Sequence, residues 1–299
     1  MIDFLCIGAH KSGTSWLDNN LKRHPEVWTP LYKELHFFDE LEFGSSITED
    51  KKRKIWLSNY LQHMAAKVKN GDTINSNNLD WALNFVQTKD HKRKIEWYTD
   101  LFRDAKKRYK SVGETTPAYA LLSRDTYKKI YTINPNIKIL FIMRNPALRD
   151  WSSLRFDLLT DKKLSNNSNN IRELDSDTIY NYLTKKGVEN RSNYLKTMKR
   201  IESIFPRENI KYLFFDQIES QPDILVEDIC NFLNIDFDLQ YFPKLLDRKL
   251  VSKEVKIDSD ILQYLKVKYR DMIDEIDKVY VQVPNTWKIF FDTDSIKDK

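Results

Sequence analysis

Short apolar runs and longer amphipathic stretches follow one another along the chain. Mainly apolar runs, each with a single charged residue, occur at residues 2–8, 137–143 and 210–215, and another apolar stretch ends at Val112-Gly113. Runs of this length without polar alternation predict strands that are buried on both faces of a sheet. Helical spacing follows at residues 14–22, 146–159 and 222–233. Strands that alternate with helices predict an α/β fold with a central, mostly parallel sheet flanked by helices.

The residues between these blocks agree with that pattern. Thr14 opens the first helix with a hydroxyl side chain, and Asn145 can cap the helix that begins at Pro146. Asparagine is favoured at the cap, and proline is tolerated at the first helical position because its missing N–H has no partner there in any helix. Both junctions therefore predict a helix that starts directly behind a strand.

Residues 45–110 do not continue the alternation. They are polar and rich in lysine, and they carry Trp56, Trp81 and Trp97 at positions compatible with helices. This composition predicts a helical insertion packed on the sheet. Because no linker rich in proline or glycine divides the chain, we expect residues 1–299 to form a single domain. The sequence SNNSNN at 165–170 predicts a mobile segment, 161–173, that closes over a substrate.

The composition narrows the class of protein. With 41% hydrophobic residues among 299, the chain can bury a large core. Its net charge of +5 is small against 49 basic and 44 acidic side chains, so a nucleic-acid partner is not expected. Cys6 and Cys230 lie in separate apolar stretches, which predicts reduced core thiols with no disulfide scaffold or zinc site.

The start of the chain has no basic leader and no cleavage site, since Asp3 is followed at once by an apolar segment. No apolar run approaches the roughly 20 residues that are needed to span a bilayer. We therefore expect a cytoplasmic protein with no membrane span.

A glycine-containing loop at residues 8–15, GAHKSGTS, joins the first strand to the first helix. Backbone N–H groups at such a junction form an anion site. The loop differs from the Walker A pattern because Thr14 follows the second glycine and the lysine comes earlier, at Lys11. A nucleotide kinase also needs an acidic metal ligand, whereas the second strand is followed by Arg144. These features favour a metal-free phosphate cradle, although Lys11 alone is equally compatible with a solvated loop lysine.

The run Lys11-Ser12-Gly13-Thr14-Ser15-Trp16 resembles the donor loop of the sulfotransferase superfamily that uses 3′-phosphoadenosine-5′-phosphosulfate (PAPS). A second motif of that superfamily, an arginine at a strand end and a serine eight residues later, is matched by Arg144 and Ser152. The resemblance implies a P-loop-like three-layer fold. It also implies that Lys11 contacts the leaving-group oxygen, that residues 12–16 hold the 5′-phosphate, and that Arg144 and Ser152 bind the 3′-phosphate.

The segment Lys33-Glu34-Leu35-His36-Phe37-Phe38 resembles the heparan-sulfate and carbohydrate branch of these enzymes. The resemblance implies that Glu34 is the general base, with His36 as the alternative base and Lys33 in a supporting role. Two other interpretations stay open, namely a surface ion pair between Glu34 and Lys33 and a core histidine at position 36.

The segment 113–119, GETTPAY, resembles the family's Glu-x-x-Pro-x-Tyr motif, with Thr115 where many heparan-type enzymes carry lysine. Glu114 is therefore expected to bind the acceptor or to support the catalytic residues, or else to be a buried strand-end carboxylate. The family's last donor element, a basic loop with a glycine, has no clear counterpart in residues 244–256.

Together these features predict transfer of a sulfuryl group from PAPS to a hydroxyl of a carbohydrate or a small polar metabolite, with an amine as a possible acceptor. No metal is expected to take part. Two alternatives remain at this point. One is a P-loop nucleotide kinase, and the other is a non-catalytic nucleotide-binding protein with the same fold. The sequence does not indicate the oligomeric state.

Overall fold

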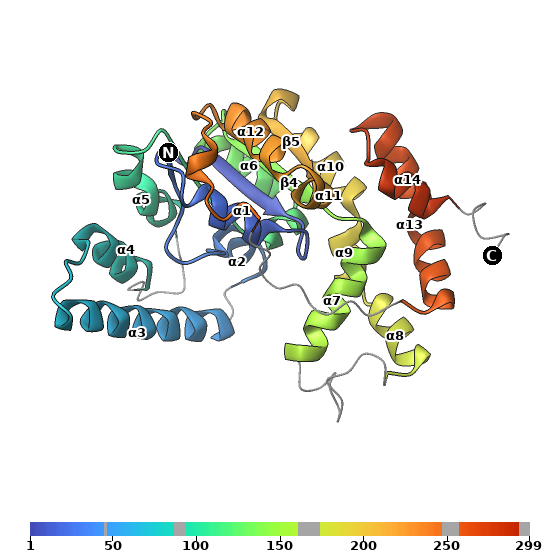
Figure 1. The fold of residues 1–299 in the computed structure, drawn as a ribbon, viewed down its shortest axis with the longest axis horizontal. Helices are drawn as coiled ribbons and strands as arrows, with labels where there is room; N and C mark the ends of the chain where they lie inside the picture. Colours follow the sequence, from blue (N-terminus) through green and yellow to red (C-terminus); the bar gives the residue numbers. More distant parts are fainter. Residues whose placement is uncertain (45–46, 87–93, 161–173, 247–256, 293–299) are drawn as a thin grey trace.

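The computed structural model describes residues 1–44, 47–86, 94–160, 174–246 and 257–292. A five-stranded sheet lies at its centre, with the strand order β2-β3-β1-β4-β5 and parallel pairing throughout. The strands are β1 Phe4–Gly8, β2 Val27–Trp28, β3 Ser111–Thr115, β4 Lys138–Met143 and β5 Ile210–Phe214. Helices flank this sheet (Figure 1), so the predicted α/β fold is confirmed.

Alternate residues of each strand face opposite helical layers. Phe4 and Cys6 pack with α1 (Thr14–Leu21) and α12 (Pro222–Leu233), whereas Leu5 belongs to a core on the other face. That second core includes residues from α5 (Ile95–Lys106), α6 (Arg124–Ile133) and α10 (Tyr194–Glu202). Two separate apolar cores on one sheet give the three layers of the fold.

The remaining helices extend the two ends of this sandwich. Figure 1 shows α3 and α4 together on one side of the sheet, and α7, α8, α13 and α14 together on the other. The bounds of these and the shorter helices are α2 Phe37–Phe43, α3 Ile47–Lys69, α4 Ser76–Val86, α7 Pro146–Thr160, α8 Ser176–Leu183, α9 Lys186–Ser192, α11 Phe215–Ser220, α13 Ser259–Val279 and α14 Asn285–Phe291.

The predicted end of the fourth strand was wrong. β3 does not stop at Gly113 but continues through Glu114 and Thr115, because it stays in register with β1 as far as the pair Cys6 and Thr115. Glu114 therefore lies inside the sheet and not in the loop behind it. Both cysteines are buried free thiols, as their apolar surroundings in the sequence predicted.

The insertion at residues 45–110 is helical where the structure describes it, but only part of it packs on the sheet. α5 packs against β3, α4 packs against α5, and α3 packs against α4. Trp81 lies in the main core, while Trp56 is half-buried between α3 and its neighbours. The prediction of a sheet-packed insertion thus holds for α5, whereas α3 is attached through α4. Residues 161–173 and 247–256 lie outside the described part of the chain.

Within the described ranges, no helix combines the length and the apolar character that a membrane crossing requires.

Candidate active site

The two predicted donor motifs meet at one edge of the sheet. β1 and β4 are neighbours, yet the chain leaves β1 toward β2 on one side and leaves β4 toward β5 on the other. In open α/β sheets a crevice forms at the carboxyl ends of two such strands, and ligands bind there. The Ala9 amide donates to the carbonyl oxygen of Ile142 at 2.6 Å and joins the two strand ends. The loop at residues 8–15 and the Arg144 segment therefore line the same crevice.

The loop at residues 8–15 has a backbone conformation that its sequence predicts only in part. Lys11 and Gly13 have φ angles of 67° and 92°, both in the left-handed region, before α1 starts at Thr14. A Cβ on Gly13 would lie 2.5 Å from Cδ1 of Ile218 and 3.1 Å from the Phe215 ring. Position 13 therefore requires glycine for its φ angle and also for the close approach of α11.

The hydroxyl side chains of the loop differ in their surroundings. Ser12 and Thr14 are buried, whereas Ser15 is exposed at the start of α1. Trp16 turns away from the crevice, since its ring belongs to the core beneath α12 and its Nε1 donates to the carbonyl oxygen of Leu245 at 2.9 Å. The indole of Trp16 thus fixes α1 in place, and its backbone N–H lies in the first turn, where amides have no helical partner.

Arg144 and Lys11 bring positive charge to the crevice without bound carboxylates. The Arg144 guanidinium lies 4.5 Å from the centre of the Phe215 ring, and the Lys11 ammonium lies 4.0 Å from that of Phe156. Neither cation forms an ion pair within the described residues. Burial lowers the pKa of Arg144, and burial together with the Arg144 charge lowers the pKa of Lys11. Two close, partly desolvated cations favour an anionic ligand between them.

Buried polar atoms without partners point the same way. Two buried side-chain atoms on the segments that flank this crevice, His10 Nδ1 and Arg144 Nε, have no hydrogen-bond partner in the described part of the chain. Unpaired buried polar groups are costly, and a ligand with several phosphate oxygens would satisfy them. The residues present therefore fit a donor with phosphate groups. Ser152 lies half-buried on α7, two turns behind Arg144.

Glu34 forms a compact charged group with its neighbours in sequence. Lys33 donates to its Oε1, His36 Nε2 lies 3.6 Å from its Oε2, and His36 Nδ1 lies 2.7 Å from Oδ2 of Asp39. Burial alone would raise the pKa of Glu34, but His36 and Lys33 outweigh it and lower that pKa to about 2. Burial alone would lower the pKa of His36, but Asp39 and Glu34 raise it to about 10. At neutral pH the group contains two carboxylates and two cations.

Glu114 contacts the segment that carries this group from within the sheet and does not reach the crevice. Its buried carboxylate accepts hydrogen bonds from the hydroxyls of Tyr98 at 2.6 Å, Thr116 at 2.7 Å and Tyr119 at 3.0 Å. The Tyr119 hydroxyl in turn accepts the Phe37 amide at 3.1 Å. Glu114 is thus a buried carboxylate within a strand that contacts the Glu34 segment through Tyr119, which is compatible both with the predicted supporting role and with the predicted buried strand-end carboxylate. Its functional role stays a prediction.

Comparison with known proteins agrees with this geometry. The model of the sulfotransferase family matches residues 3–239. The chain belongs to that family. It is 24% identical over 156 residues to a protein of Dictyostelium discoideum named membrane-associated sulfotransferase kil1, a match that covers 52% of this chain and only 23% of the relative.

Solved sulfotransferases share the fold. A sulfotransferase from Alicyclobacillus acidocaldarius superposes with a TM-score of 0.62 at 21% identity, covering 96% of this chain and 99% of the other. A mouse sulfotransferase, SULT7A1, complexed with PAP superposes with a TM-score of 0.50 at 13% identity, covering 97% of this chain and 88% of the other. At these identities the likeness concerns the fold alone.

The structure places two further residues of this family member at the same edge of the sheet, which the sequence interpretation missed. His10 lies beside Phe156, and burial followed by the charges of Arg191 and Arg149 lowers its pKa to about 4. A signal for His10 existed, since it directly precedes Lys11. Phe215 follows a strand end, as ligand-facing residues commonly do. An aromatic residue at such a position is, however, typical of the hydrophobic core, so the sequence alone does not indicate a site.

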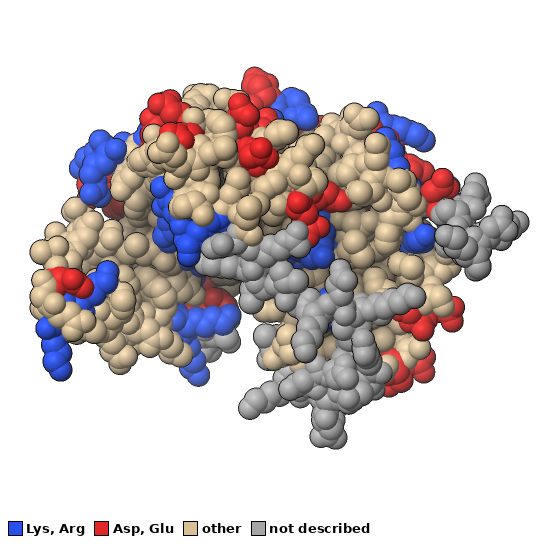
Figure 2. All heavy atoms as spheres, viewed as in Figure 1, with Lys and Arg blue, Asp and Glu red and all other residues tan. Residues whose placement is uncertain are grey.

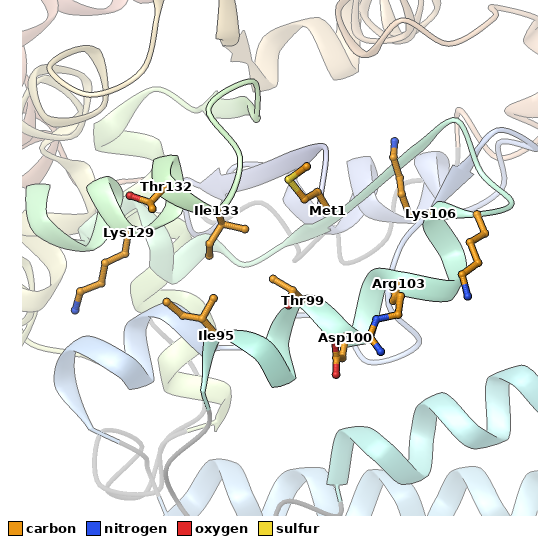
Figure 3. A pocket seen from close by; sticks show the side chains of 10 residues that line it. Met1, Ile95, Thr99, Asp100, Arg103, Lys106, Lys129, Thr132 and Ile133 are labelled. Carbon is orange, nitrogen blue, oxygen red and sulfur yellow. Dashed lines mark hydrogen bonds and ion pairs between the residues drawn. The ribbon is translucent and has the colours of Figure 1, made fainter.

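No group of three or more metal-ligating side chains is present among the described residues. Figure 2 shows basic and acidic side chains mixed over the visible face. A hollow of about 630 Å³ lies at the opposite edge of the sheet, between α5 and α6 beside Met1 (Figure 3). Three of its four lining cations lie in ion pairs, because Arg103 pairs with Asp100, Lys106 lies 2.6 Å from Asp3 and Lys107 lies 2.8 Å from Asp104. It is therefore less suited to an anion than the crevice.

Proposed function

We propose that this protein transfers a sulfuryl group from PAPS to an acceptor hydroxyl. The observation that carries the proposal is the meeting of Lys11 and Arg144 at the switch point of the sheet, where each cation lies over an aromatic ring and neither forms an ion pair with a described residue. PAPS offers one anionic group for each of them. Its 3′-phosphate suits the planar guanidinium of Arg144, assisted by Ser152, and its 5′-phosphosulfate suits the loop amides and Lys11.

The proposed chemistry is an in-line displacement at sulfur. The acceptor oxygen forms a new bond to sulfur while the bond from sulfur to the bridging phosphate oxygen breaks, and 3′-phosphoadenosine-5′-phosphate (PAP) departs. Negative charge grows on the bridging oxygen during this step, so a fixed ammonium at Lys11 stabilises the transition state more than the ground state. The acceptor proton passes to the carboxylate of Glu34.

Glu34 must change partners to act as a base. In the free protein its Oε1 is bound by Lys33, and a carboxylate with a pKa of about 2 accepts protons poorly. We propose that the acceptor hydroxyl takes the place of Lys33 at Oε1. Loss of that cation raises the pKa of Glu34 when a proton has to be received, and it frees Lys33 to neutralise the sulfuryl oxygens.

The acceptor is proposed by class. The Glu34 segment resembles that of carbohydrate sulfotransferases, which supports a sugar hydroxyl, while a small polar metabolite or an amine fits the same chemistry. A nucleotide kinase is disfavoured because β4 is followed by Arg144, where a magnesium ligand would be acidic. A binding protein without turnover would have no use for Lys11 and Glu34. The cytoplasmic location and the single domain stay predictions.

Calorimetric titration with PAP is the first test of the donor. We expect PAP to bind to the purified protein in the absence of metal, and ATP with magnesium not to compete with it, because the Arg144 side of the crevice selects the 3′-phosphate. ATP·Mg binding without PAP binding would reject the proposal and favour a kinase.

Replacement of Arg144 by methionine should weaken PAP binding. Loss of a charged hydrogen bond costs about 1.5–3 kcal/mol, which corresponds to a roughly 10- to 100-fold higher dissociation constant. Arg207→Met is the matched control, since that guanidinium also stacks on an aromatic ring, 4.9 Å from the centre of Tyr212, but at the other edge of the sheet. Equal PAP affinity of the two variants would remove Arg144 from the donor site.

A further inference from the structure

The helical insertion reaches into the catalytic segment through one buried arginine. Arg53 lies on α3 and is only 1% exposed. Its Nη2 donates to the carbonyl oxygen of Leu35 at 2.8 Å and to Oε1 of Glu40 at 2.8 Å, and its Nη1 donates to Oδ1 of Asp50 at 3.2 Å. Leu35 is the residue between Glu34 and His36. A side chain of the insertion thus binds the backbone between Glu34, the proposed base, and His36.

The other side of the same segment is held from the sheet. The Leu35 amide bonds to the Glu114 carboxylate, and the Phe37 amide donates to the Tyr119 hydroxyl at 3.1 Å. The Leu35 side chain itself is fully buried. Leu35 is therefore hydrogen-bonded at its carbonyl oxygen to Arg53 on α3 and at its amide to Glu114 on β3, two elements that are far apart in sequence. These two hydrogen bonds are together called the grip on Leu35.

This grip coincides with an unusual backbone. Glu34 and His36 have φ angles of 64° and 54°, and they are two of four non-glycine residues with positive φ in the described chain. Such conformations are unfavourable for these residues and persist only where the surroundings hold them. The residue between them carries the bonds that do so. Without these bonds the segment would relax, and the side chains of Glu34 and His36 would move apart.

Attachment of a helix through a buried arginine also costs desolvation free energy. Desolvating a guanidinium costs more than packing an apolar side chain, and Arg53 Nε has no hydrogen-bond partner among the described residues. Attachment of α3 alone would be served by a leucine or a methionine. A guanidinium adds something different, because its fork can bind a backbone carbonyl and a carboxylate together.

We propose that Arg53 is a positioning residue, through which α3 of the insertion holds the Leu35 backbone and thereby sets the geometry of Glu34 and His36. The inference rests on the proposed function for its consequence in catalysis, while the geometric part stands by itself. It follows that a ligand that shifts α3 would alter the base without touching the donor crevice.

The test compares Arg53→Met with the wild-type chain by NMR titration of the His36 ring and by calorimetry with PAP. His36 is faced by Glu34 and Asp39, with Lys33 on the far side of Glu34. Release of Leu35 should separate His36 from Glu34, so its pKa should fall from about 10 by at least roughly one unit, toward the ordinary value. PAP affinity should stay within roughly twofold, because no donor contact is lost.

Arg53→Lys is the second variant at position 53 if Arg53→Met does not fold, and Tyr119→Phe tests the hold on the same segment from the sheet side. It removes only the hydroxyl that accepts the Phe37 amide and keeps the ring in the core. The matched control is Tyr212→Phe, which loses a hydroxyl bonded to Glu202 at 2.7 Å away from the segment. A downward shift of the His36 pKa in Tyr119→Phe but not in Tyr212→Phe supports the grip.

The outcomes separate the two proposals. An unchanged His36 titration in folded Arg53→Met, or in Arg53→Lys where Arg53→Met does not fold, would overturn the positioning role even if PAP binds. A lowered His36 pKa in a protein whose wild-type form does not bind PAP would instead leave the grip standing and reject the sulfotransferase proposal. Arg53→Lys should show a smaller shift than Arg53→Met, since an ammonium keeps the charge but not the fork.

Discussion

Lys11→Met is expected to lower the rate of sulfuryl transfer roughly 10²- to 10³-fold, the loss seen when one preorganised group at a developing charge is removed. Methionine keeps the length of the chain and the apolar contact with Phe156 but removes the cation. Because the charge on the bridging oxygen grows as its bond to sulfur breaks, the loss should fall on kcat more than on the KM for PAPS. Single-turnover release of PAP from PAPS measures it.

A suitable control for this variant is Lys266→Met. Lys266 also lies over an aromatic ring, 5.4 Å from the centre of Phe290, on α13 and away from the crevice, and it is more deeply buried than Lys11. Its variant reports what the loss of a buried, ring-stacked lysine does to the fold alone. If Lys11→Met and Lys266→Met turned over equally well, the leaving-group role would be wrong, whatever the affinity for PAP.

The core of the fold was predictable because its signals are local. Residues 138–143 and 210–214 form strands where mainly apolar runs predicted them, and α7 starts at Pro146 directly behind the predicted cap Asn145. The second strand ends one residue before its predicted end, because Phe215 begins α11, a helix that the sequence did not predict. Asn145 Oδ1 accepts the Ala147 amide at 3.1 Å, as a capping side chain should. Each of these features is contained in fewer than about a dozen neighbouring residues, so contacts with distant parts of the chain change the local structure little.

Other parts of the fold depend on distant partners, which one sequence does not contain. β2 has only two residues, Val27 and Trp28, and it is a strand only because it pairs with β3. β3 extends past Gly113 because β1 accompanies it. The place of α3 was missed for the same reason, since its attachment relies on the buried Arg53, which reads as a surface residue in a lysine-rich helix.

The site was predictable in its composition but not in its shape. The motif positions of Lys11 and Arg144 fix which strand ends they follow, and the order of the strands then brings them together. The left-handed backbone at Lys11, Glu34 and His36 could not be predicted, since only glycine announces such conformations. Backbone strain of this kind gathers at functional sites, and it is notable that three of the four such residues in the described chain are the three proposed for catalysis.

The dependence of the rate on pH separates the two bases that the sequence left open. Glu34, with a pKa of about 2, is ionised throughout the working range, so catalysis by Glu34 predicts a constant rate between pH 6 and about pH 9. His36 is protonated below about pH 10 and must lose a proton before it can act as a base. Catalysis by His36 therefore predicts a rate that rises roughly tenfold per pH unit over the same range.

Glu34→Gln is expected to lower transfer to an alcohol roughly 10²- to 10⁴-fold, the contribution of a general base. Glutamine keeps the size of the side chain but cannot take the proton. The dependence on the acceptor makes the result specific, because an acceptor that is already ionised, such as a nitrophenolate, has no proton to give and should lose far less. The measurement is the ratio of variant to wild-type rates for a sugar alcohol and for 4-nitrophenol.

The control for Glu34→Gln is Asp39→Asn. Asp39 contacts the same imidazole, with Oδ2 2.7 Å from His36 Nδ1, but it does not bind Lys33 at the proposed acceptor position. Its loss perturbs the charge of the group without removing the base. If Glu34→Gln slowed both acceptors equally, the carboxylate would act by electrostatics or by holding His36, and not by accepting a proton. A loss confined to the alcohol, together with a rate that is constant with pH, assigns the proton to Glu34 and leaves His36 as the cation that orients it.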